Sequence, residues 1–192
     1  MIWLTADTHL GHENIITQAN RPFRSVEQMD EHIIGAINEM VAPSDELYVL
    51  GDFSFRTSRE DVRMYRWLLR CNNVYLVRGN HDMLWHGQSP FQREYGYYDQ
   101  LHSPRPRRHR IVMCHYPILS WRSMDFGSIH AHGHIHADVG YNLRNRDAGI
   151  FRYDVGVEAN GYAPVSLDYL TRFFDGVEPR RAHHTEEERS TW

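Results

Sequence analysis

Short apolar runs alternate with helical patterns along the first 80 residues of the chain. Residues Ile2 to Ala6, Glu46 to Leu50 and Asn73 to Val77 form brief apolar runs typical of buried strands. Apolar residues recur at nearly every 3.6 positions after Ser25, and a second helical pattern runs from Ser58 to Leu69. This order predicts an α/β arrangement with parallel strands in the first half of the chain.

The second half of the chain shows shorter elements. The patterns there predict strands at Ile111 to Cys114 and Ser128 to His132, a hairpin formed by Val139 to Leu143 and Gly149 to Val157, and a last helix from Leu167 to Phe174. We therefore expect one domain over residues 1–175, followed by a polar tail over residues 176–192.

Composition narrows the class of protein. The 192 residues are 41% hydrophobic, which suits a globular domain, and no apolar run approaches the roughly 20 residues that cross a bilayer. The N-terminal residues lack the charged and apolar regions of a signal peptide, and Cys71 and Cys114 form no disulfide framework. These features predict a cytoplasmic protein, and the net charge of -4 argues against a generally basic nucleic-acid binder.

Histidine is unusually frequent, with 14 residues, and many of them lie in five short polar clusters. Each cluster falls at the end of a predicted strand. The clusters are Asp7-Thr8-His9, Gly51-Asp52, Gly79-Asn80-His81-Asp82, His115 with Tyr116 and Pro117, and Gly133-His134-Ile135-His136. Because ligand sites in open α/β sheets gather at the carboxyl ends of strands, the five clusters are expected to converge on one crevice.

The spacing within the clusters indicates metal binding. Residues two apart on a strand share a face, so Asp7 and His9 are expected to point together, as are His134 and His136. Glycine precedes Asp52, Asn80 and His134, where it permits sharp turns and close backbone approach. A donor set of carboxylate, amide and imidazole groups suits manganese, iron, zinc or nickel better than calcium or magnesium.

In this order, the five clusters resemble those of the calcineurin-like metallophosphoesterase superfamily. The resemblance covers residues 7–136 and implies a four-layer αββα sandwich of two mixed sheets flanked by helices. It also implies two divalent metal ions, with manganese favoured and iron, zinc or nickel as alternatives. One ion would be held by Asp7, His9, Asp52 and His136, and the other by Asp52, Asn80, His115 and His134, with Asp52 as the bridge.

The resemblance further implies hydrolysis of phosphate esters by a hydroxide that bridges the two ions. His81 would act on the phosphate as a cation or general acid, and Asp82 would orient it. The stretches around His12 and Arg21 resemble a subgroup of small stand-alone bacterial and phage proteins, and both residues are candidates for phosphate contacts. The family pattern G-D-x-x-D is incomplete, because Phe55 stands in place of the second Asp.

Several features remain open from the sequence. His130 and His132 are interpreted as strand or near-site residues, and the segment from Asp154 to Glu158 as a strand with a structural role. The basic run from Arg105 to Arg110 is either an attractive surface for polyanions or, as we favour, a solvated loop. The aromatic stretch from Trp85 to Tyr98 would either wall the pocket or pack as a lid.

The favoured function is an enzyme that hydrolyses phosphodiesters, because a short chain without a large capping domain leaves its site open. A phosphomonoesterase acting on a small phosphorylated metabolite or nucleotide is the alternative, followed by a non-catalytic metal-binding scaffold of the same fold. A structural zinc protein is disfavoured by the lack of a cysteine-rich site. The expected partner is a phosphate ester, with nucleotides and nucleic-acid ends included, and neither a membrane nor an obligatory protein partner is expected.

Overall fold

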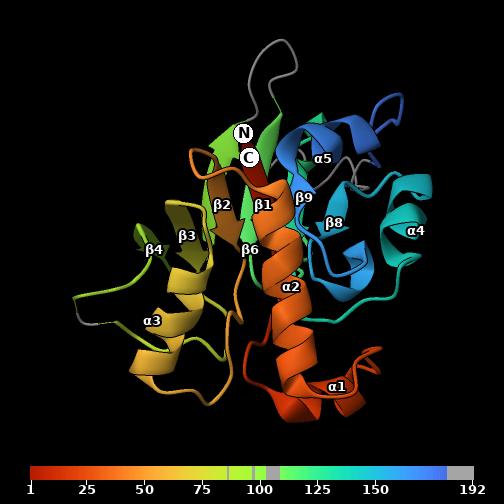
Figure 1. Cartoon of the computed structure of the whole chain (residues 1–192). Coiled ribbons are helices and arrows are strands. Elements are labelled where there is room, and N and C mark those ends of the chain that lie inside the picture. Colours follow the sequence, from red (N-terminus) through yellow and green to blue (C-terminus); the bar gives the residue numbers. More distant parts are fainter. Residues whose placement is uncertain (86, 97, 103–108, 181–192) are drawn as a thin grey trace.

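Two β-sheets lie face to face at the centre of the computed structural model, which describes residues 1–85, 87–96, 98–102 and 109–180 (Figure 1). The first sheet has the order β4-β3-β2-β1-β9, with β1 Ile2–Thr5, β2 Glu46–Val49, β3 Asn73–Val77, β4 Arg93–Tyr95 and β9 Val165–Ser166. The second has the order β5-β6-β7-β8, with β5 Tyr98–His102, β6 Arg110–Cys114, β7 Ile129–His132 and β8 Arg152–Asp154. Strands β9 and β5 are antiparallel to their neighbours and the others pair in parallel, so both sheets are mixed, as expected.

Alternating side chains on the strands divide the interior into two apolar layers. On β1, Leu4 belongs to the cluster between the sheets, where Ile111 and Met113 of the second sheet also lie. Its neighbour Trp3 belongs instead to the cluster beneath the helices, together with Ile33. A strand buried on both faces reads as a continuous apolar run, which explains why the sequence pattern of β1 shows no polar alternation.

Helices α2 Val26–Met40 and α3 Arg59–Leu68 cover the outer face of the first sheet (Figure 1). Each helix begins after the serine at which its sequence pattern starts: the hydroxyl of Ser25 accepts a hydrogen bond from the backbone N–H of Gln28, and Ser58 forms a capping box with Asp61. A short helix α1, Glu13–Gln18, follows the first loop and was not predicted.

The outer face of the second sheet has a thinner cover. Helix α4, Tyr141–Asp147, and the segment 116–127 with its 3₁₀ turn Met124–Phe126 lie over it. Trp121 packs on His130 and Tyr141 on His132, which ties both pieces to β7. Helix α5, Leu167–Phe173, packs against β1 and β9. The two sheets flanked by helices confirm the expected fold class.

The predicted hairpin over residues 139–157 is wrong. Its first arm is helix α4, and its second arm contains β8, which pairs in parallel with β7. Asn142, interpreted as a turn residue, instead exchanges hydrogen bonds with the backbone N–H and carbonyl of Asp154. This tertiary contact anchors α4 to β8 and overrides the local turn preference.

Contacts with the core continue past the expected domain boundary at residue 175. Val177 packs against the cluster between the sheets, and the backbone N–H of Arg180 donates to the carbonyl of Gly149. The remainder of the predicted tail, residues 181–192, lies outside the described residues.

Among the described helices, none combines the length and apolar character that a bilayer crossing requires.

Candidate metal centre

Five loops meet at the carboxyl ends of β1, β2, β3, β6 and β7, where the sequence predicted a crevice. Backbone hydrogen bonds connect these loops directly. The N–H of Asp7 donates to Gly51, that of His9 donates to Asp52, and that of Gly133 donates to His115, each at 3.0 Å. The backbone N–H of His134 donates to Asp7 Oδ2 at 2.8 Å and links the loops of the two sheets into one platform for the predicted ligands.

The side chains on this platform fall into two groups of potential ligands. The ligand atoms of Asp7, His9 and His136 lie within 4.8 Å of one another, and so do those of Asp52, His115 and His134. Asn80 Oδ1 adjoins the second group, 3.0 Å from His115 Nε2. The grouping agrees with the two ligand sets that the family resemblance implies, and the structure brings all seven residues together.

Asp52 lies between the two groups. Its Oδ2 is 3.6 Å from His9 Nε2 in the first group and 3.4 Å from His115 Nε2 in the second. Its Oδ1 accepts a hydrogen bond from the backbone N–H of His81, which fixes the orientation of the carboxylate. This is the position that a bridging ligand requires.

Unpaired polar atoms make the first group a candidate cation site. Asp7 Oδ1 and His9 Nε2 are buried and lack a hydrogen-bond partner within the described part of the chain. Buried polar atoms in native proteins are normally satisfied, so these two need a partner that the protein does not supply. A divalent cation fits, because carboxylate oxygen and imidazole nitrogen are ligands of manganese, iron, zinc and nickel.

The electrostatics of the site point the same way. Burial, together with repulsion by Asp154, Glu158 and Asp52, raises the pKa of Asp7 well above its usual value. Burial also lowers the pKa of His9 to about 2, so its imidazole is neutral and available as a ligand. A cation among these carboxylates would offset their mutual repulsion.

Three glycines permit the close packing of the ligands. A Cβ at Gly133 would lie 2.4 Å from Asp7 Oδ2, one at Gly79 would lie 2.2 Å from Asp52 Oδ1, and one at Gly51 would lie 2.3 Å from His115 Nδ1. The expectation that glycine allows close backbone approach is therefore confirmed at all three positions.

Strand alternation is not what aligns the ligand pairs. Strand β1 ends at Thr5 and β7 at His132, so all four residues of the two pairs lie in loops. The ligands with left-handed backbone are Asp7, His9, Asp52, His134 and His136, with φ between 46° and 75°. Left-handed residues are uncommon outside glycine, and they turn these loops back so that their side chains converge.

The two predicted catalytic residues, His81 and Asp82, lie in different surroundings. His81 is at the surface of the site, with Nε2 3.9 Å from Asp52 Oδ2 and its ring beside Phe55. The carboxylate of Asp82 accepts hydrogen bonds from the backbone N–H groups of Asp52, Phe53 and Gly79. Asp82 thus clamps the loop of Asp52, and its hydrogen bonds do not include the His81 ring that it was expected to orient.

The two predicted phosphate contacts also differ. His12 lines the groove beside the site, and its Nδ1 lies 3.2 Å from His9 Nδ1. Arg21 is buried behind the site, where it donates to the backbone carbonyls of Asp7 and Thr8. Its guanidinium also pairs with Glu158 at 2.7 Å. This placement does not support a phosphate contact by Arg21 and makes it a brace for the first loop.

Two carboxylates of the site were not identified from the sequence. Glu158, in the 3₁₀ turn Glu158–Asn160, accepts from His136 Nδ1, and Asp154 accepts from the backbone N–H groups of Ala137 and Gly156. The segment was interpreted as structural, and its local pattern contains no motif that marks either residue. Their roles come from contacts distant in the sequence.

The remaining candidates lie away from the ligands. His130 is buried on β7 and bonds to backbone groups of Val112, Tyr116 and Ile118, and His132 contacts Tyr141.

In the aromatic stretch from Trp85 to Tyr98, Phe91 packs on Phe53, and Tyr95 stacks with Tyr48. None of the described aromatic residues of that stretch lines the groove. Residues 105–108 of the basic run lie outside the described part.

A groove of about 760 Å³ opens beside the first ligand group. Its walls carry imidazoles, amides and one arginine. They are formed by His9, His12, Asn14, Ile15, Gln18, Ala19, Asn20, Phe55, Arg56, His81, Ile135 and His136. The structure therefore places a polar groove directly beside the potential metal ligands.

Comparison with known proteins identifies the family. The sequence profile of the calcineurin-like phosphoesterases matches residues 1–162. An uncharacterized protein of Methanocaldococcus jannaschii is 32% identical over 176 residues, covering 91% of each chain, and the gene 66 protein of Mycobacterium phage L5 is 25% identical over 212 residues, covering 95% of this chain and 98% of its own. A solved protein of unknown function from Aquifex aeolicus matches with a TM-score of 0.71 at 25% identity, over 90% of this chain and 98% of that one. The chain therefore belongs to the calcineurin-like phosphoesterase family, a superfamily of hydrolases.

Proposed function

We propose that the protein is a dinuclear-metal-dependent phosphoesterase, with phosphodiesters as the favoured substrates. The carrying observation is the pair of ligand groups that share Asp52, with unpaired Asp7 Oδ1 and His9 Nε2 buried in the first. Family membership supports the reaction class. Manganese is the favoured metal, and iron, zinc or nickel would suit the same donors.

The chain would hold the metals with all seven predicted ligands. Asp7, His9 and His136 would bind one ion, while Asn80, His115 and His134 would bind the other, and Asp52 would contact both. When bound, two such cations withdraw charge from the phosphoryl group and lower the pKa of coordinated water. Metal binding needs ionised carboxylates and neutral imidazoles, and burial keeps His9 in the neutral state by lowering its pKa to about 2.

His81 is suited to act on the substrate and not on the metals. Its side chain is 36% exposed, whereas Asp52 beneath it is 2% exposed. The ring sits at the mouth of the groove, held between Phe55 and His9. From there, Nε2 would donate a hydrogen bond to a phosphoryl oxygen or a proton to the leaving oxygen.

The groove supports a substrate with groups on both sides of the phosphate. It extends from His81 to Asn14 and Gln18 on α1, and Arg56 is the only guanidinium among its described lining residues. A diester would place its second ester arm along this polar wall, so nucleotides and nucleic-acid ends are included as substrates. A small monoester, or a scaffold that binds metal without turnover, would leave most of the groove unused.

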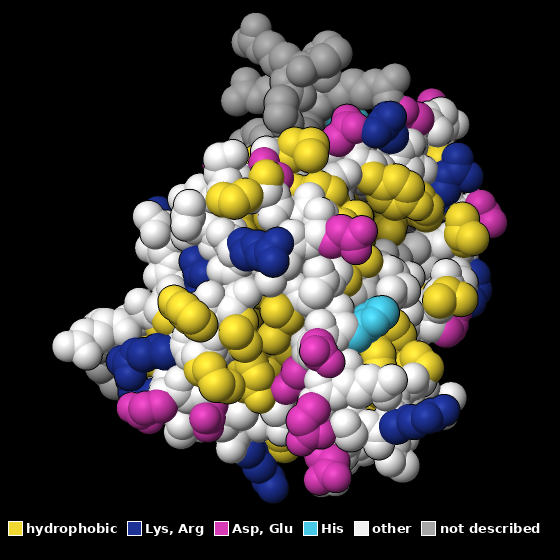
Figure 2. All heavy atoms as spheres, viewed as in Figure 1, with side chains coloured by type: hydrophobic (Ala, Val, Ile, Leu, Met, Phe, Trp, Pro, Cys, Tyr) yellow, Lys and Arg dark blue, Asp and Glu magenta, His cyan; other side chains and the backbone are white. Residues whose placement is uncertain are grey.

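Two observations bear on partners and location. On the face shown in Figure 2, arginine side chains are scattered among acidic ones and form no continuous basic field over the described residues. This charge pattern supports a small phosphate ester or a nucleic-acid end as the substrate over a long nucleic-acid duplex.

Cys71 and Cys114 are buried free thiols, which supports the proposed cytoplasmic location.

The test is metal-dependent turnover. The purified protein is stripped with chelator, supplied with manganese, and assayed on an aryl phosphodiester and the matching monoester, with Asp52→Asn as the blank. We expect manganese-dependent hydrolysis that is lost in the variant and faster on the diester. Faster hydrolysis of the monoester would instead support the alternative, a phosphomonoesterase. Stoichiometric metal without turnover on either ester, with iron, zinc and nickel also tried, would identify a scaffold.

A further inference from the structure

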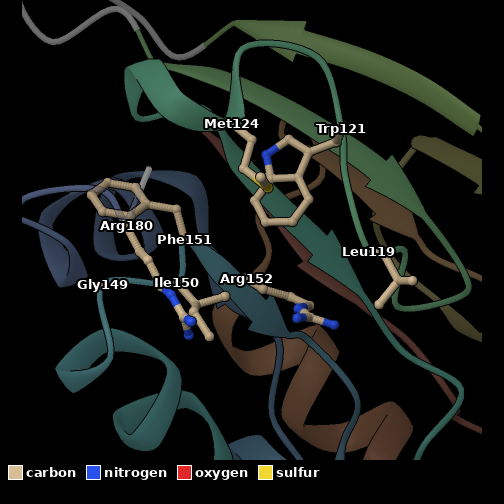
Figure 3. A pocket seen from close by; sticks show the side chains of 8 residues that line it. All are labelled: Leu119, Trp121, Met124, Gly149, Ile150, Phe151, Arg152 and Arg180. Atoms are coloured by element: carbon tan, nitrogen blue, oxygen red, sulfur yellow. The ribbon is translucent and has the colours of Figure 1, made fainter. Parts of the chain in front are cut away.

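A second cavity, of about 170 Å³, lies on the outer face of the second sheet (Figure 3). It is enclosed by the segment before the 3₁₀ turn, by the start of β8 and by the first residues after the last helix. The lining residues are Leu119, Trp121, Met124, Gly149, Ile150, Phe151, Arg152 and Arg180. Arg152 opens β8, whereas the metal ligands follow the carboxyl ends of strands, so the cavity lies at the opposite end of the sheet.

The apolar walls of this cavity are held in place by contacts behind them. Trp121 donates its indole N–H to the carbonyl of Ser128 at 3.0 Å, and Phe151 stacks on Phe174 with ring centroids 4.6 Å apart. Both aromatic residues are less than a tenth exposed. The cavity is therefore largely preformed, and an apolar cavity of about 150 Å³ is large enough for a benzene ring.

Two guanidinium groups face this apolar cavity without an anion. In Figure 3 the side chains of Arg152 and Arg180 point to the same side of the cavity, with Ile150 between them. Arg152 is half-buried and its buried Nε has no hydrogen-bond partner among the described residues, while Arg180 is exposed. Neither guanidinium has an ion pair among the described residues, in contrast to Arg144, which pairs with Asp138. A buried guanidinium N–H without an acceptor calls for an anionic ligand.

We propose that this cavity binds a small aromatic carboxylate, whose ring fills the space between Trp121 and Phe151 while its carboxylate pairs with Arg152 and Arg180. The cavity has room for a ligand with a single ring, and its aromatic walls favour a ring that is itself aromatic. The two neighbouring guanidinium groups favour a ligand with a negative charge. The site shares no lining residue with the groove of the metal centre, so it stands independently of the proposed activity.

The test uses benzoate as the probe, titrated into the full-length protein by calorimetry, with benzyl alcohol and inorganic phosphate as matched probes lacking the charge or the ring. We expect saturable binding of benzoate, and a Kd at least about tenfold weaker for benzyl alcohol and for phosphate at this site. Equal affinity for benzyl alcohol would overturn the role of the arginines, and absence of saturable benzoate binding would overturn the site.

Variants locate the binding. Arg152→Met removes the charge at similar length and should weaken benzoate binding about tenfold or more, whereas Arg144→Met, at an exposed ion pair on α4, should leave the Kd unchanged. Leu119 is 90% exposed, so Leu119→Glu should fold normally and repel benzoate at the cavity mouth. Asp52→Asn should not change the Kd. Binding that survives both cavity variants but is lost in Asp52→Asn would place benzoate at the metal centre and refute the proposal.

Discussion

The carboxylate of Glu158 accepts a hydrogen bond from His136 Nδ1 at 2.8 Å, and the same oxygen pairs with Arg21 at 2.7 Å. Because an ionised carboxylate only accepts, the proton of His136 resides on Nδ1 and leaves the lone pair of Nε2 for a metal. Burial alone would raise the pKa of Glu158, but the hydrogen bond from His136 and the charge of Arg21 hold it below its usual value. Glu158 is thus the residue that orients a predicted ligand.

Glu158→Gln should weaken metal binding without unfolding the protein. An amide is a weaker acceptor for His136 and leaves Arg21 without its counter-charge, and loss of such an orienting carboxylate typically costs 10- to 100-fold in metal affinity. The measurement is competition for manganese against a chelator of known affinity. Glu60→Gln, at an exposed residue of α3, serves as the control. Equal affinity in both variants would show that Glu158 does not orient the ligand.

Gly133→Ala should disable the site, whereas Gly35→Ala should leave it intact. The added Cβ at residue 133 would meet Asp7 Oδ2 at 2.4 Å, and a displacement of this size at a reacting centre costs about 100-fold in turnover. A Cβ at Gly35 meets nothing within 4 Å, and in a helix it should stabilise the fold by about 0.5–1 kcal/mol. Metal content, turnover and denaturant unfolding of the two proteins provide the comparison.

His81→Ala should reduce turnover by about 100- to 10,000-fold while both metals stay bound, because His81 is placed over the substrate and outside both ligand groups. The paired measurements are kcat on the preferred ester and metal content per chain. His32→Ala, at a histidine that packs on Phe23 away from the site, is the matched control. Turnover at the parent rate would remove His81 from the mechanism.

Asp30 should make the stability of the fold depend on pH. Burial raises the pKa of Asp30 to about 6, although hydrogen bonds from Tyr65 and Gly11 oppose the shift. The folded state then holds this proton more tightly than the unfolded chain, in which the pKa is about 4. The ionised group therefore destabilises the fold above pH 6, by up to about 3 kcal/mol, and the penalty fades as the pH falls from 6 towards 4.

Urea unfolding of the parent and of Asp30→Asn at several pH values measures this contribution. The difference in free energy of unfolding should shift in favour of the variant as the pH rises from 4 to 7. A pH-independent difference for Asp30→Asn would contradict the raised pKa.

The convergence of the ligands was predictable because it follows from topology. Asp7, Asp52 and His134 each come directly after a strand whose apolar run is evident in the sequence, and parallel strands bring their carboxyl ends to one edge. The geometry that aligns the pairs was not predictable, because left-handed backbone at His9 and His136 is imposed by contacts between loops. Their roles as ligands remain predictions until metal binding is measured.

The residues that orient the ligands could not be predicted either, because their contacts join positions that lie far apart in the sequence. Glu158 contacts His136 across 22 residues and Arg21 across 137, so no local pattern marks it. Arg21 was expected at the phosphate from the resemblance to a subgroup of small bacterial and phage proteins, but the structure places it behind the first loop, where it pairs with Glu158. Helix α4 was missed because Asn142 favours turns locally, whereas its hydrogen bonds to Asp154 and the packing of Tyr141 on His132 hold this segment as a helix against the second sheet.

The left-handed backbone lowers the stability of the fold at five predicted ligands, which are Asp7, His9, Asp52, His134 and His136. Such a conformation costs a residue other than glycine about 1 kcal/mol or more, so the loops that carry the donors weaken the protein that carries them. The proposed metal-binding role accounts for residues other than glycine at five positions where glycine would relieve the backbone strain.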